Sequence, residues 1–118
     1  MNELPLSFAP HVPAERRVVF LKKLAAQLAK DLYPLFNENI PDEPSPEWIM
    51  EHTHGAVHEL VTSRSSDLGN VLYRIDIPEA KIRALMAQTS SDERVQVLAF
   101  QILEREAKKV WLRLNYQG

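Results

Sequence analysis

The 118-residue sequence contains no cysteine, only three glycines and no long apolar run. The missing cysteine excludes disulfides, thiolate zinc sites, iron–sulfur clusters and cysteine nucleophiles. No stretch approaches the roughly 20 apolar residues that a transmembrane helix needs. The N-terminal stretch, MNELPLSFAPHVP, lacks the basic start and apolar centre of a secretory signal and holds three prolines. We therefore expect a cytoplasmic protein with no membrane partner.

Lysine and arginine are absent from one continuous segment, residues 31–63, although the net charge of the chain is only −2. The segment holds seven acids: Asp31, Glu38, Asp42, Glu43, Glu47, Glu51 and Glu59. All 14 basic residues lie elsewhere. Charge blocks in small domains usually complement each other or face water. The pattern predicts that this acidic segment lies against basic helices of the same chain.

The periodicity of apolar residues predicts an all-α fold, a small bundle of four to five helices in a single domain. An irregular N-terminal arm, 1–12, precedes a helical domain, 13–118. Helices are predicted at 14–33, 46–62, 77–88 and 91–114. The stretch 66–77 fits both a strand and a helix, and a short helix is favoured because no partner strand is evident. The first and last helices have the longest apolar stripes and are predicted to form the main packed pair.

The sequence also predicts which residues of these helices are buried, which cap a helix and which need an ion-pair partner. The buried stripes are predicted to be Val18, Leu21, Leu24, Ala25, Leu28 and Leu32 on the first helix, and Ile49, Thr53, Ala56, Val57 and Leu60 on the second. Asp76 and Glu79 have the spacing of a capping box that would open the helix 77–88. Glu106 falls inside the apolar arc of the last helix, where a carboxylate needs a partner. Lys109 or Arg113 is predicted to pair with the Glu106 carboxylate and to hold it at the edge of the buried face.

Three of the four histidines lie within the stretch EHTHGAVHE, residues 51–59. On a helix Glu51, His54 and His58 fall within about 60° of one another, so they could share a divalent metal. The zinc-protease motif HExxH is not matched, since Gly55 stands where it needs a glutamate. The leading interpretation is a solvated helix flank, and a metal-dependent enzyme using these three residues is the alternative.

Two further groups of residues suggest binding surfaces. Arg16, Lys23 and Lys30 form a basic stripe on the first helix, which could follow a nucleic-acid backbone. The acidic pI and the lack of a stacking motif argue against that partner. On the last helix, an apolar excess of Phe100, Trp111, Leu112 and Leu114 predicts an interface with a second copy in a homodimer.

The sequence has no P-loop, no GxGxxG and no GxSxG, which argues against an enzyme without excluding one. No cofactor is implied beyond the alternative metal. The sequence therefore favours a small soluble helical protein-interaction or regulatory module, whose partner is another protein or a copy of itself. The metal-dependent enzyme and the nucleic-acid binder are the alternatives.

Overall fold

The computed structural model describes residues 12, 14–37, 39–90 and 93–116. This part of the chain forms five α-helices, one turn of 3-10 helix at Ser65–Asp67, and no strand. The α-helices are α1 (Ala14–Asp31), α2 (Pro46–Ser63), α3 (Leu68–Ile75), α4 (Glu79–Ala87) and α5 (Arg94–Tyr116). The all-α fold predicted from the sequence is confirmed. The predicted N-terminal arm lies, except for Val12, outside the described residues.

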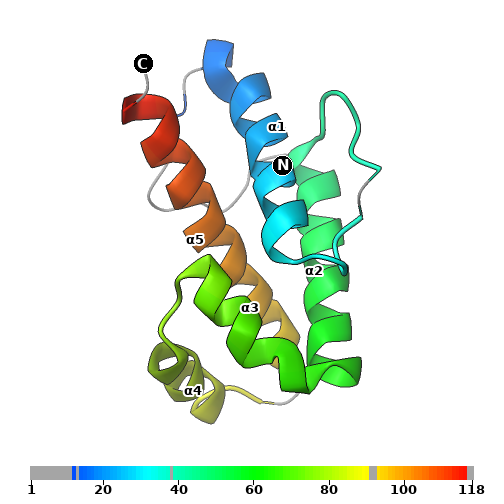
Figure 1. Ribbon diagram of the computed structural model, residues 1–118, viewed down its shortest axis with the longest axis vertical. Coiled ribbons are helices and arrows are strands. Elements are labelled where there is room, and N and C mark those ends of the chain that lie inside the picture. The colour runs from blue at the N-terminus through cyan, green and yellow to red at the C-terminus, as the bar shows by residue number, and fades with distance from the viewer. Residues whose placement is uncertain (1–11, 13, 38, 91–92, 117–118) are drawn as a thin grey trace.

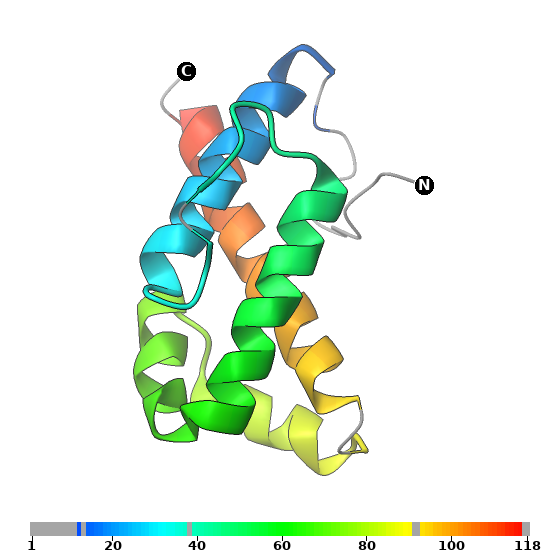
Figure 2. The same ribbon diagram turned by 90° about the vertical axis from the view of Figure 1, so that its right-hand side faces the viewer.

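The longest helix, α5, forms the axis of the bundle (Figure 1). Helices α1 and α2 both pack along it, and α3 lies beyond the C-terminal end of α1, so that α1 and α3 together flank α5 (Figures 1 and 2). The short α4 closes the end of the bundle between α3 and α5. The predicted pairing of the first and last helices is confirmed, but α2 contacts α5 to the same extent.

Helix α2 follows its sequence signals closely. The Ser45 hydroxyl accepts a hydrogen bond from the Trp48 backbone N–H at 3.0 Å, and Pro46 occupies the first turn, where its missing N–H costs nothing. All five residues of the predicted apolar face are buried. The period-3.6 pattern was sufficient here because one face of the helix meets the core and the other meets solvent.

The buried face of α1 differs from the prediction at two positions. Val18 is 48% exposed, whereas Phe20 is only 2% exposed. Phe20 packs edge-on against Trp111 of α5, with ring centroids 6.4 Å apart. This aromatic contact turns the buried face of the first half of α1 toward α5, so the prediction for Val18 was wrong.

The ambiguous stretch 66–77 is helical, with Val71, Leu72 and Ile75 buried. The helix ends at Asp76, whose φ of 72° is left-handed. The backbone N–H of Ile77 donates to the Leu72 carbonyl and that of Asp76 to the Tyr73 carbonyl, which is the Schellman arrangement. The predicted capping box was therefore wrong: Asp76 ends α3, and α4 starts after Pro78 without a side-chain cap.

Candidate functional sites

A fully buried carboxyl group, Glu106 of α5, lies inside the bundle with a side chain that is 0% exposed. Lys109 Nζ, one turn further on, is 2.8 Å from Glu106 Oε2 and 2.9 Å from Asp31 Oδ2 at the end of α1. Lys109 was correctly predicted as a partner. The predicted move of Glu106 to the rim was wrong, because Lys109 and Asp31 reach it in the interior.

The three groups of this cluster shift one another's protonation. Burial, together with a hydrogen bond to Asp31 and the charge of Asp31, raises the pKa of Glu106 to about 8, although Lys109 acts in the opposite direction. Burial would also raise the pKa of Asp31, but hydrogen bonds from Glu106, Lys109 and Gln27 outweigh it and hold that pKa below its ordinary value. Burial opposes the charged form of Lys109, yet its two acidic partners raise its pKa. At neutral pH the cluster is therefore a protonated Glu106 beside a charged Lys109–Asp31 pair.

Further hydrogen bonds connect this cluster to three helices. Gln27 Nε2 donates to Asp31 Oδ2 at 2.8 Å, and Arg113 Nη1 donates to Gln27 Oε1 at 3.1 Å. Lys109 Nζ also lies 3.4 Å from the Arg74 carbonyl of α3. Arg113 thus binds Gln27, and its predicted contact with Glu106 was wrong. The arrangement fixes α1, α3 and α5 relative to one another.

The histidines of α2 lie in two different environments. His52 is half-buried: its ring stacks on Trp48 at a centroid distance of 4.1 Å, and its Nδ1 is 2.8 Å from the Trp48 carbonyl. Phe36 packs edge-on against both rings. His54 and His58 are exposed on the outer face of α2. Only His52 therefore contributes to packing.

Glu51, like His54 and His58, is exposed on α2. Within residues 12, 14–37, 39–90 and 93–116, no group of three or more histidine, aspartate and glutamate side chains is arranged to hold a metal ion. The metal site predicted at these three residues stays a prediction, for which the structure shows no additional ligand from a neighbouring helix.

The four apolar residues predicted to form an interface on α5 are not equivalent. Trp111 and Leu114 are half-buried and pack against the core, whereas Phe100 and Leu112 are 37% and 39% exposed. The two exposed residues are separated by about 18 Å along the helix and about 120° around it. The four residues therefore do not form one continuous surface, and the α5 interface stays a prediction.

The charges of the acidic segment mostly remain without partners in the chain. Asp31 pairs with Lys109. The other described acids of the segment are exposed and form no ion pair with any residue that the structure describes: Asp42, Glu43, Glu47, Glu51 and Glu59. The predicted internal pairing is confirmed for Asp31, and Asp42 and Glu43 line one cleft with Lys22 and Lys23 of α1 without forming an ion pair. We refer to these five residues as the acidic surface.

Part of the predicted basic stripe lines a groove between α1 and α5. This basic groove has a volume of about 310 Å³ and is lined by Lys23, Lys30, Arg113 and Gln27 around Ala26, Val110 and Leu114. None of its three cations forms an ion pair with a described acid. Arg16 instead donates to the Leu114 carbonyl at 3.1 Å. Positive charge is therefore concentrated in the groove.

Comparison with protein-family models, curated proteins and solved structures gave no match. Among the helices that the structure describes, none combines the length and the apolar character needed to cross a membrane. The surfaces and clefts of the chain itself therefore carry the information about its function.

Proposed function

We propose that this protein is an interaction module that associates with further copies of itself by placing the acidic surface of one copy in the basic groove of the next. The observation that carries the proposal is the charge distribution. Five exposed acids and three groove cations have no ion-pair partner in the described chain. Both sets of charges are free to pair with another molecule.

Asp42 and Glu43 of the acidic surface share a cleft with Lys22 and Lys23 of α1, whereas no residue of α2 lines the basic groove. Helix α2 runs along one side of the bundle, and the groove between α1 and α5 lies on another (Figures 1 and 2). Glu47 and Glu51 are one turn apart on the exposed side of α2. Because both side chains are exposed, they can reach the cations of the basic groove on a second molecule.

A contact between two different patches can continue head-to-tail along a series of copies or occur twice across a two-fold axis. Pairs of exposed charges are individually weak and are screened by salt. The association should therefore depend on several charges at once and should weaken steeply with ionic strength.

Sedimentation velocity of untagged protein tests this proposal. At low ionic strength and about 100 µM protein we expect species heavier than one 13.5 kDa chain, which dissociate in 0.5 M NaCl because the Debye length falls below about 5 Å. A single chain at low salt over this concentration range would overturn the proposal.

Charge reversal identifies the surfaces. Glu47→Lys with Glu51→Lys should abolish association, and so should Lys23→Glu with Lys30→Glu. An equimolar mixture of the two variants should associate again, because each then offers a surface opposite in charge to one on the other. Lys81→Glu with Arg94→Glu makes the same change in net charge as Lys23→Glu with Lys30→Glu, at exposed positions outside the groove, and is the control. Failure of the mixture to associate would exclude this pair of surfaces.

A further inference from the structure

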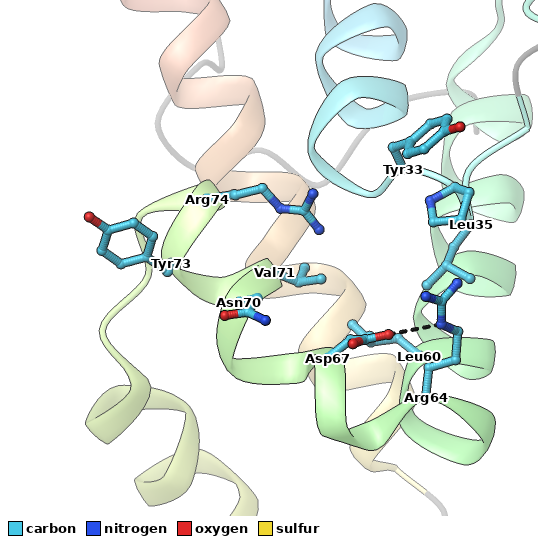
Figure 3. A pocket seen from close by; sticks show the side chains of 10 residues that line it. Tyr33, Leu35, Leu60, Arg64, Asp67, Asn70, Val71, Tyr73 and Arg74 are labelled. Atoms are coloured by element: carbon cyan, nitrogen blue, oxygen red, sulfur yellow. Dashed lines mark hydrogen bonds and ion pairs between the residues drawn. The ribbon is translucent and has the colours of Figure 1, made fainter.

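A second cleft lies where the end of α1, the end of α2 and α3 meet (Figure 3). Its volume is about 340 Å³. The turn after α1 contributes Tyr33 and Leu35, α2 contributes Leu60 and Arg64, and the segment from Asp67 to Arg74 forms the remaining wall. The cleft is therefore built from three segments that are distant in the sequence.

The charges that line this cleft leave one positive charge in excess. Arg64 Nε donates to Asp67 Oδ2 at 2.8 Å, so these two charges neutralise each other. Arg74, by contrast, forms no ion pair with any acid in the described part of the chain. Figure 3 shows its side chain extending from α3 toward the end of α1. The free guanidinium can form two parallel hydrogen bonds to one carboxylate.

The remaining lining combines an apolar floor with polar groups. Pro34 and Leu35 offer the accessible apolar surface of that floor, whereas Leu60 and Val71 beneath it are buried at 0% and 2% exposure, and Asn70 adds an amide. Tyr33 is 58% exposed beside the cleft, so its ring is available to a ligand. Tyr73 points away from the other lining side chains in Figure 3 and has no part in this argument.

The buried cluster holds two walls of the cleft in place. Lys109 Nζ is within 2.9 Å of Asp31, two residues before Tyr33, and within 3.4 Å of the carbonyl of Arg74 itself. One ammonium group therefore ties the end of α1 to the end of α3. A cleft whose walls are fixed in advance loses less entropy when a ligand binds.

We infer that this cleft binds a singly charged carboxylate carried on an apolar body, with the carboxylate on Arg74 and the apolar body against Tyr33, Pro34 and Leu35. A small aromatic or aliphatic acid has this chemistry, and so has the free C-terminus of a peptide that ends in an apolar residue.

Backbone amide shifts in NMR spectra, followed during titration with benzoate, test the inference on the full chain. We expect saturable shifts at Tyr33, Asn70 and Val71, with a dissociation constant on the order of 1 mM for so small a ligand. Benzamide, its neutral isostere, should bind at least tenfold more weakly. Equal binding of the two, or shifts that avoid the cleft, would overturn the inference.

Variants at Arg74 test whether its guanidinium binds the carboxylate. Arg74→Gln should weaken benzoate binding at least tenfold, and Arg74→Lys, which keeps the charge but loses the planar pair of donors, should weaken it by a smaller factor. Arg83→Gln, at an exposed ion pair on α4, should change nothing. The spectrum of each unliganded variant shows whether it is folded. Unchanged affinity in a folded Arg74→Gln variant would overturn the assignment.

Titration with a short peptide distinguishes the two possible sources of the carboxylate. A tripeptide ending in leucine with a free C-terminus, if it binds more tightly than benzoate and loses this affinity when amidated, identifies a peptide C-terminus as the ligand. Tighter binding of benzoate identifies a free organic acid. Absence of binding by both carboxylates would overturn the inference.

Discussion

The Lys109 ammonium on α5 lies 2.9 Å from Asp31 Oδ2 at the last residue of α1. The two residues are 78 positions apart in the sequence, and their side chains are only 17% and 8% exposed. Since Glu106 shares the same ammonium, the interior holds two acids and one cation. A low-dielectric interior disfavours the surplus negative charge, which is the physical reason that Glu106 keeps its proton.

Glu106→Gln should remove a pH dependence of stability. The pKa of Glu106 is about 8 in the folded protein against 4.5 as its ordinary value. Between these pH values the folded state keeps a proton that the unfolded state has lost, so the contribution to stability is complete below pH 4.5 and is lost as pH rises to 8. Glutamine imitates the protonated acid, because it can donate to Asp31 and accept from Lys109.

The two proteins should therefore have similar free energies of unfolding near pH 5. The variant should be more stable near pH 8.5, by an amount on the order of 4 kcal/mol. Urea unfolding of both proteins from pH 5 to 9 measures the difference, in which the other titrating groups cancel. If the free energies of unfolding of the two proteins changed in parallel with pH across this range, Glu106 would be ionised in the folded state.

Lys109→Met should destabilise the protein by about 3–5 kcal/mol at neutral pH, because it leaves two carboxyl groups without their cation. The loss should be greater at pH 8 than at pH 5, where Glu106 stays protonated. Lys108→Met, at the exposed neighbouring position, should cost less than about 0.5 kcal/mol. Adding Asp31→Asn to Lys109→Met should recover part of the loss, and no recovery would argue against the buried pair.

Asp76→Gly should leave stability unchanged or raise it by up to about 1 kcal/mol, because glycine adopts a φ of 72° without strain. The ion pair that is lost, from Asp76 to Arg105, involves a carboxylate that is 78% exposed and contributes little. Asp76→Ala keeps the strain and loses the pair, so it should be the less stable variant in thermal unfolding. An Asp76→Gly variant clearly less stable than the wild type would show that the ion pair with Arg105 outweighs the strain at Asp76.

A metal site on α2 predicts that untagged protein carries stoichiometric zinc or iron, and that His54→Ala with His58→Ala abolishes it. Elemental analysis of both proteins measures this directly. Since both side chains are exposed, the double variant should fold as well as the wild type. Metal content that does not change in the variant would dispose of the site at Glu51, His54 and His58.

The sequence predicted what depends on local periodicity and missed what depends on contacts between distant segments. The buried face of α2 follows from residue spacing alone, and Glu106 stands out because it falls inside the apolar arc of α5, with Lys109 at i+3. Asp31 carries no local signal of its role, since its partner lies on another helix. The cleft at Arg74 was missed for the same reason: its lining comes from three segments, and no single one has a motif.

Leu28→Ala and Val18→Ala form a matched pair that tests how α1 is turned in the bundle. The apolar pattern placed both residues on one buried face, but Leu28 is 0% exposed and Val18 is 48% exposed. Leu28→Ala should cost about 2–5 kcal/mol, because it removes fully buried methyl groups and leaves a cavity. Val18→Ala should cost less than about 1 kcal/mol, since about half of its side chain already contacts solvent. Urea unfolding gives both values. An unchanged slope of the free energy of unfolding against urea concentration would confirm that the unfolded state is the same. If Val18→Ala cost as much as Leu28→Ala, the first half of α1 would bury Val18, and the edge-on packing of Phe20 against Trp111 would not set the orientation of this helix.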